Sequence, residues 1–189
     1  MAAAEPIRDK KQIRELAGYW LKRGNPRNYA LIVLGVCTAL RVGDLLQLRW
    51  CDVYDFESGE FRDRVSLTEK KTGKPKTIAL NKQALRALNL LFSSRKSAYI
   101  FANNRKTPQP LSRVQAWRII RTAADGINSA ERVACHSLRK TFGYHAWVGG
   151  TSPVVIMDIY NHTSYETTKR YLGVSQDDRD KVYLKMALF

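Results

Sequence analysis

An arginine follows a long apolar stretch of the sequence, where a positive charge is unexpected. Arg41 comes directly after the near-apolar run from Tyr29 to Leu40, and Asp44 lies three residues further on. A guanidinium group is costly to bury unless an anion or a carboxylate accompanies it. Asp44 is therefore a candidate partner for Arg41. A purely structural Arg–Asp pair explains the two residues as well as an anion-binding site does.

Two further segments carry cationic side chains at spacings that suit anion binding. His136 and Arg139 are three residues apart, so on a helix they share one face and can converge on one small anion. Lys71 precedes Thr72-Gly73-Lys74-Pro75, which predicts a turn between two strands. Each segment also has an ordinary explanation, because a His–x–x–Arg pair is often a surface coincidence and hairpin lysines often blunt a sheet edge.

His162 and Tyr171 could cooperate only if the chain turns between them. On one straight helix they would lie about 13 Å apart along the axis. A helix that ends at His162, followed by a turn and a new helix from Thr163, would let the two side chains approach. A tyrosine before Leu172-Gly173 is otherwise an ordinary core aromatic.

In their order along the chain, these residues resemble the catalytic domain of the tyrosine recombinase (phage integrase) family. Two departures from the usual pattern are visible: Asn161 replaces the glycine that usually precedes the second histidine, and Gly43-Asp44 replaces a small residue followed by Glu. Asn tolerates a left-handed backbone, so the first departure is conservative. The residues that carry the resemblance are Ala39-Leu40-Arg41 with Asp44, Lys71-Thr72-Gly73, His136-Ser137-Leu138-Arg139, His162 and Tyr171.

The resemblance implies a site-specific recombinase that cleaves and rejoins DNA without a metal. Tyr171 would be the nucleophile and form a covalent 3′-phosphotyrosyl intermediate. Arg41 and Arg139 would bind the two non-bridging phosphate oxygens, which suits the forked guanidinium group. Lys71, on its hairpin, would protonate the leaving 5′ oxygen.

The remaining polar residues of the pattern have supporting roles in this reading. His136 and His162 would hydrogen-bond the phosphate or assist proton transfer, and Asp44 would orient Arg41 or His136. His145 lies off the pattern and is expected to be structural. We expect no cofactor and no metal, because the sequence has neither C-x-x-C, H-E-x-x-H nor G-x-x-x-x-G-K-[ST] spacing.

The elements that must position these residues read as an α+β, mainly helical domain. One three-stranded antiparallel sheet is expected, with Lys71 at a turn. Asn81, Ser112, Ser152 and Thr163 are expected to cap helices. The helix after Ser112 has apolar residues every three positions, at Val114, Trp117 and Ile120. The expected strands are 52–56, 62–67 and 76–80, and the expected helices are 27–40, 81–92, 112 onward, 137–147, 152–160, 163 onward and 177–188.

The composition favours a nucleic-acid partner. Lys and Arg number 32 against 17 Asp and Glu, which gives the 189-residue chain a formal net charge of +15. A charge of this size in a globular chain suits binding to a polyanion, here double-stranded DNA. Three scattered cysteines suit reduced thiols, and no signal peptide or membrane-spanning run is visible, so a cytoplasmic, DNA-associated protein is expected.

Residues 1–189 are expected to form one catalytic domain. The family's preceding DNA-clamping domain has no counterpart before Arg8, so the chain is either the catalytic part of a longer recombinase or a short member made of this domain alone. A non-catalytic DNA-binding regulator, a topoisomerase-like DNA-relaxing enzyme and an RNA-binding protein are the alternatives. An aromatic-rich strand for stacking RNA bases is missing.

The C-terminal residues carry large apolar groups near a free chain end, at Val182, Leu184, Met186, Leu188 and Phe189. They could fold back onto the chain's own core. The resemblance instead implies docking into a neighbouring protomer, with a monomer in free solution and a tetramer on paired DNA sites.

Overall fold

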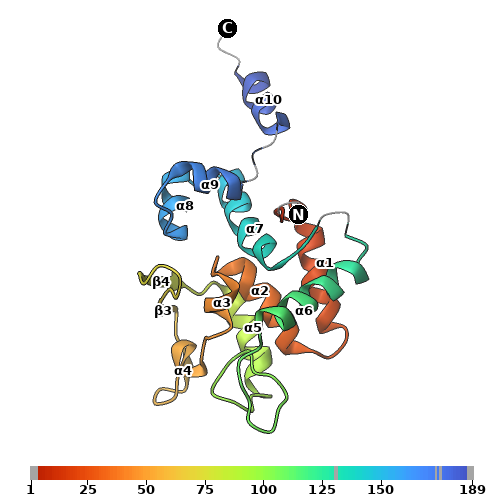
Figure 1. Ribbon diagram of the computed structural model, residues 1–189, viewed down its shortest axis with the longest axis vertical. Coiled ribbons are helices and arrows are strands. Elements are labelled where there is room, and N and C mark those ends of the chain that lie inside the picture. The colour runs from red at the N-terminus through yellow and green to blue at the C-terminus, as the bar shows by residue number, and fades with distance from the viewer. Residues whose placement is uncertain (1–3, 130–131, 173, 175, 187–189) are drawn as a thin grey trace.

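The computed structural model describes residues 4–129, 132–172, 174 and 176–186. Helices form most of it, and two small β-hairpins lie at one side (Figure 1). The expected α+β, mainly helical class is confirmed. No helix in the described part of the chain is both long and apolar enough to cross a membrane.

Helix α2 (Pro26–Cys37) lies at the centre of the body, packed against α1 (Lys10–Leu21), α5 (Lys82–Phe92) and α7 (Cys135–Val148). The Asn25 side chain caps its first turn, directly before Pro26. The helix ends at Cys37, three residues before the expected end, because Ala39 adopts a left-handed φ of 54°.

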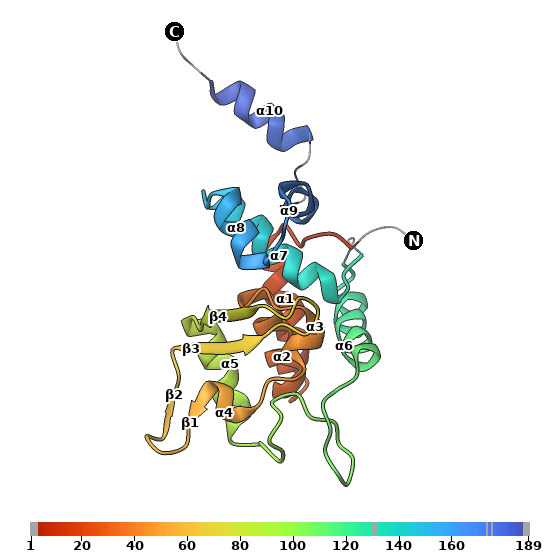
Figure 2. The same cartoon turned by 60° about the vertical axis from the view of Figure 1, so that its left-hand side comes forward.

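The expected three-stranded sheet is wrong in detail, since the described strands form two separate antiparallel hairpins (Figure 2). One pairs β1 (Tyr54–Asp55) with β2 (Glu60–Phe61), and the other pairs β3 (Arg64–Thr68) with β4 (Pro75–Ala79). Of the expected strand 62–67, residues 64–67 lie in β3, while Arg62 and Asp63 lie between the hairpins and form backbone hydrogen bonds with two different segments. The Arg62 N–H donates to Val53 O, whereas Asp63 O accepts from Leu80 N–H.

Short helices lead into the two hairpins. Helix α3 (Val42–Leu45) follows Arg41 directly, and α4 (Trp50–Val53) occupies the start of the first expected strand. Helix α5 begins after Asn81, whose side chain accepts the Ala84 N–H as expected of a cap.

Among the described residues after α5, the regular elements are all helices. Helix α6 (Arg113–Gly126) is capped by Ser112, and α8 (Pro153–Tyr160) is capped by Ser152, both as expected. Helix α9 begins one residue later than Thr163 would place it, at Tyr165–Leu172, because Ser164 Oγ accepts the Thr167 N–H.

Packing places two features of these helices where the sequence pattern did not. Of the three periodic apolar residues of α6, only Ile120 is buried, while Val114 and Trp117 are 56% and 48% exposed. Helix α10 (Gln176–Lys185) stands away from the body (Figure 2), and its Val182 and Leu184 are exposed. The tail therefore does not fold back on its own core. Leu188 and Phe189 lie outside the described residues.

A small apolar cluster supports the region where the polar residues of the pattern meet. Ala39, Ile156, Tyr160 and Leu172 are fully buried in it, with the Tyr171 ring packed against them. The cluster joins the segment after α2 to α8 and α9, so it supports Tyr171 on α9 and His162 in the corner between the two helices.

Candidate active site

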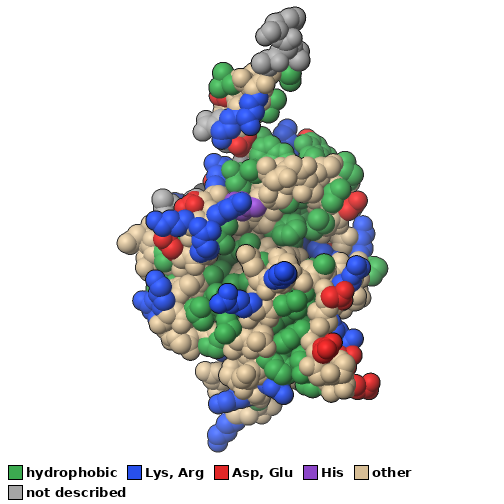
Figure 3. Space-filling model, turned by 180° about the vertical axis from the view of Figure 1, so that it is seen from behind, with side chains coloured by type: hydrophobic (Ala, Val, Ile, Leu, Met, Phe, Trp, Pro, Cys, Tyr) green, Lys and Arg blue, Asp and Glu red, His purple; other side chains and the backbone are tan. Residues whose placement is uncertain are grey.

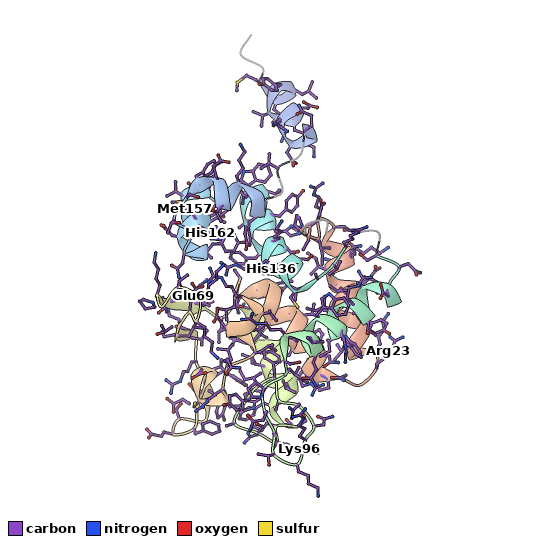
Figure 4. All side chains as sticks on the ribbon, in the orientation of Figure 1. Arg23, Glu69, Lys96, His136, Met157 and His162 are labelled. Carbon is purple, nitrogen blue, oxygen red and sulfur yellow. The ribbon has the colours of Figure 1, made fainter. Side chains whose placement is uncertain are left out.

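The polar residues singled out in the sequence gather where four segments meet: the α2–α3 corner, the β3–β4 turn, α7 and the α8–α9 corner. In Figure 4, Glu69, His136 and His162 lie in this region, each on a different segment. Sequence-distant residues thus form one site.

Arg139 forms the buried base of the site and is 1% exposed. Its Nη1 donates to the Ala39 carbonyl and its Nη2 to the Tyr160 carbonyl, the latter at 2.9 Å. Its guanidinium carbon lies 4.4 Å from the Tyr160 ring centroid and 5.8 Å from that of Tyr171. Nε is buried and has no hydrogen-bond partner among the described residues. A chance surface arginine would have none of these contacts, so the ordinary explanation of the His136–Arg139 pair is excluded.

Tyr171 lies beside both histidines. Its ring centroid is 4.8 Å from that of His162 and 6.3 Å from that of His136. Asn161, with a φ of 52°, ends α8 in the left-handed conformation that the sequence anticipated for it. This corner turns the chain so that the side chains of His162 and Tyr171, nine positions apart, come into ring contact.

Both histidines are held in the neutral form near pH 7. Burial and then the charges of Arg139 and Arg41 lower the pKa of His162 to about 4. Desolvation, followed by the charge of Arg139, also lowers the pKa of His136. The His162 Nδ1 lies 3.0 Å from Thr168 Oγ1, which fixes the ring orientation. A neutral imidazole beside Tyr171 can accept a proton.

The structure corrects the expected role of Asp44. Its Oδ1 accepts the Lys70 N–H at 3.0 Å and so holds the β3–β4 turn. Arg41 instead pairs with Glu69, at 2.7 Å between Nη1 and Oε2. Asp44 therefore supports the segment that carries Lys71 and does not orient Arg41 directly.

Lysines approach the site in two different ways. Lys71 is exposed on the turn, and its positive charge contributes to the lowered pKa of His136. Lys76, on β4, is buried and its Nζ donates to the Ile159 carbonyl at 2.6 Å. Burial, followed by the charge of Arg139, lowers the pKa of Lys76 to about 8.

Glu69 and Lys76 are the site residues that sequence reasoning missed. Glu69 is a lone carboxylate in a strongly basic stretch, and Lys76 pairs with Leu67 on the partly buried face of the hairpin. A carboxylate in a basic stretch and a lysine on a partly buried strand face are both unusual, so the sequence carried a signal for each. Their partners come from distant segments, so the sequence did not show what either side chain contacts.

The other His and Cys side chains have different surroundings. No group of three or more His, Cys, Asp or Glu side chains suited to a metal ion occurs among the described residues. Burial raises the pKa of Cys135 to about 11, which opposes a thiolate nucleophile next to His136. The His145 Nε2 lies 3.0 Å from the Ile7 carbonyl, a contact that suits the structural role expected for this histidine.

Basic side chains extend beyond the site. On the face in Figure 3, Lys and Arg side chains are spread over the body and over α10. On α6, Arg113 and Arg118 are exposed beside Trp117. Exposed positive charge of this kind favours binding to a phosphate backbone.

Comparisons with known proteins agree with this geometry. The sequence profile of the Phage integrase family matches residues 8–177. The chain is 34% identical over 184 residues to the "Probable integrase/recombinase YoeC" of Bacillus subtilis (strain 168), covering 97% of each chain.

Two solved structures share the fold. One is the XerA recombinase, with a TM-score of 0.77 at 21% identity over 99% of this chain and 68% of that one. The other is a lambda integrase dimer bound to a COC′ core site, with a TM-score of 0.72 at 18% identity over 100% of this chain and 53% of that one. The chain thus spans about half of the lambda integrase chain.

Proposed function

The chain belongs to the phage integrase family and is a tyrosine-type site-specific recombinase, and we propose that it breaks and rejoins double-stranded DNA with Tyr171 as its nucleophile. The observation that carries this assignment is the position of Tyr171, in ring contact with His162 and beside the buried guanidinium of Arg139. Tyr160 cannot serve instead, because it is buried and its hydroxyl donates to the Arg139 carbonyl.

The reaction proceeds by exchange of one phosphoester bond for another. The Tyr171 hydroxyl attacks the phosphorus and passes its proton to a neutral histidine, His162 or His136. The bond from phosphorus to the 5′ oxygen breaks, Lys71 protonates that oxygen, and a 3′-phosphotyrosyl ester remains. Attack by the 5′-hydroxyl of another strand reverses these steps and releases Tyr171.

The two arginines stabilise the charge that builds on the phosphate. Arg139 is held by two backbone carbonyls and Arg41 by Glu69, so both are oriented before DNA arrives. Preoriented charges of this kind lower the barrier because no reorganisation is needed during the reaction. The donors left free on each guanidinium bind the non-bridging oxygens.

The protein acts on DNA in the cytoplasm as a monomer that assembles into a tetramer on paired sites. The exposed apolar residues of α10 support this proposal, since Val182 and Leu184, and Met186 directly after the helix, are not covered by the described part of the chain. One catalytic domain alone is proposed to span residues 1–189.

Covalent trapping tests the proposed function. The probe is a pool of duplexes with a randomised segment followed by a nick. Cleavage next to the nick releases a short fragment with the new 5′-hydroxyl, which prevents rejoining. Wild-type protein should form adducts that survive denaturation, and sequencing them identifies the preferred site. Tyr171→Phe should form none, while Tyr165→Phe, at a position 49% exposed on the same helix, should match the wild type.

The same experiment separates the alternatives. Complete absence of adducts with wild-type protein, together with tight DNA binding, would indicate a non-catalytic regulator. Adducts that persist in Tyr171→Phe would move the nucleophile to another tyrosine. Relaxation of supercoiled plasmid without exchange between sites would indicate a topoisomerase-like enzyme.

A further inference from the structure

Glu69 is a buried carboxylate outside the set of site residues predicted from the sequence. It ends the β3 side of the Lys71 hairpin, and its side chain is 0% exposed. An isolated buried carboxylate is strongly unfavourable, so such a residue persists only when its contacts compensate for desolvation.

Its contacts come from three of the segments that carry catalytic residues. Thr72 Oγ1, from the turn that carries Lys71, donates to Glu69 Oε2 at 2.9 Å. Asn161 Nδ2, from the residue before His162, donates to the same oxygen at 3.1 Å. Arg41 Nη1 lies 2.7 Å from it. One carboxylate oxygen therefore joins Arg41, the Lys71 turn and the His162 corner.

On the basis of the proposed function, we propose that Glu69 is a positioning residue that holds Arg41, the Lys71 turn and the His162 corner in their reactive arrangement without touching the DNA. It occupies the role that sequence reasoning gave to Asp44. Asp44 holds the same turn from its other side, through the Lys70 N–H.

The charge of Glu69 is needed as well as its shape. Burial alone would raise its pKa, but the contact with Arg41 and the hydrogen bonds from Asn161 and Thr72 outweigh burial and lower the pKa to about 2. Glu69 is therefore ionised at neutral pH. Its negative charge offsets Arg41 and also Lys76, whose Nζ lies 3.8 Å from Oε1. Without it, these cations would repel each other and Arg139.

The contact with Glu69 leaves part of the Arg41 guanidinium free to bind a phosphate oxygen. A guanidinium has five N–H donors in a plane, and Glu69 engages Nη1. The arginine side chain remains 18% exposed, so it reaches the surface where DNA arrives. The carboxylate thus fixes one edge of Arg41 and leaves another for a phosphate oxygen.

Glu69→Gln tests the proposal with little change in volume. The amide replaces one acceptor oxygen with a donor, which opposes the N–H groups of Arg41 or Asn161. Single-turnover cleavage of the trapped duplex should slow by about 100-fold, as expected for a small misplacement of catalytic groups. Its Kd for the same duplex should stay within about twofold, because Glu69 makes no DNA contact. Glu15→Gln, an exposed glutamate paired with Lys11, is the matched control and should cleave at the wild-type rate.

A substrate with a 5′-bridging sulfur separates positioning from general loss of structure, because its leaving group needs no proton. Thr72→Val removes the turn's side-chain hydrogen bond to Glu69, together with a longer one that Thr72 Oγ1 accepts from the Lys74 N–H at 3.4 Å. Both lie in the Lys71 turn, so the sulfur substrate should restore its cleavage to the wild-type rate. Glu69→Gln should be restored only in part, since Arg41 stays misplaced. The double variant should be no slower than Glu69→Gln alone, because both changes remove the same link.

Several results would overturn the proposal. These are wild-type cleavage by Glu69→Gln, an equal loss on both substrates, or effects of the two variants that multiply. If Glu69→Gln does not fold, the exposed-turn variant Thr72→Val decides, and wild-type cleavage by it overturns the proposal. Failure of the proposed function is distinct, since wild-type protein itself would then form no adduct.

Discussion

The backbone carbonyl of Ala39 accepts a hydrogen bond from the buried guanidinium of Arg139, and Ala39 holds that carbonyl in place with a φ of 54°. A left-handed conformation is unfavourable for any residue with a Cβ, by roughly 1–2 kcal/mol. The site thus depends on a strained backbone residue at the end of α2, where the chain leaves the helix for Arg41.

Substitution of Ala39 should separate conformation from volume. Ala39→Val places a β-branched side chain in a left-handed, fully buried position, and it should lower the free energy of unfolding by about 2–4 kcal/mol. Ala39→Gly relieves the strain but loses a buried methyl group and adds chain entropy, so it should stay within about 1 kcal/mol of the wild type. Urea unfolding measures both. A valine variant as stable as the wild type would show that the left-handed conformation is not required.

Arg139→Lys should nearly abolish cleavage, by about 10²–10³-fold or more. An ammonium group cannot hold the Ala39 and Tyr160 carbonyls and also present a fork to the phosphate. Single-turnover trapping with the nicked duplex measures the loss. Arg14→Lys, at an exposed position of α1, is the control. Normal cleavage by Arg139→Lys would remove Arg139 from the catalytic set.

Lys71→Ala should slow cleavage by about 10²–10⁴-fold, the usual contribution of a general acid. A 5′-bridging sulfur leaving group should restore the rate, because it departs without a proton. If the sulfur substrate restores Lys76→Ala instead, the buried lysine with a pKa of about 8 is the acid. If neither variant is restored, the role passes to Lys70, Lys74 or a histidine.

Acid should destabilise the DNA-free protein partly through His162. Its pKa is about 4 in the folded chain against an ordinary 6.5, so the unfolded chain binds the proton more readily. The penalty from His162 is therefore absent above pH 6.5 and grows as the pH drops toward 4, so stability falls over this range. Glu69, with a pKa of about 2 against an ordinary 4.5, adds a further loss below pH 4.5. His162→Asn should show a shallower decline between pH 6.5 and 4 in urea unfolding, and an unchanged decline would contradict this assignment.

Local signals in the sequence were sufficient for the starts of α5, α6 and α8 and for the left-handed residue at the α8–α9 corner. The caps at Asn81, Ser112 and Ser152 depend on bonds within three residues, so they form wherever the sequence places them. Asn161 likewise carries its own tolerance for a left-handed backbone. The turn at Asn161 is what brings His162 and Tyr171 together.

Contacts between residues distant in the sequence could not be predicted from local patterns. The partner of Arg41 depends on how the β3–β4 hairpin packs against α3, and no spacing rule chooses Glu69 over the nearer Asp44. The single sheet failed for the same reason, because Arg62 bonds to the segment before it and Asp63 to the segment after β4. Tertiary packing, and not local secondary-structure propensity, decided the partner of Arg41 and the separation of the two hairpins.

Helix α10 stands apart from the body (Figure 2), with Val182 60% and Leu184 86% exposed. Large apolar groups in water favour association with a surface that covers them. Deletion of residues 178–189 should therefore weaken DNA-dependent assembly much more than binding to a single site. Light scattering of the complex on paired sites measures assembly, and gel shifts on one site measure binding. Val182→Ser with Leu184→Ser, which keeps the helix, should reproduce the deletion. Assembly unchanged in both variants would show that this helix does not link protomers.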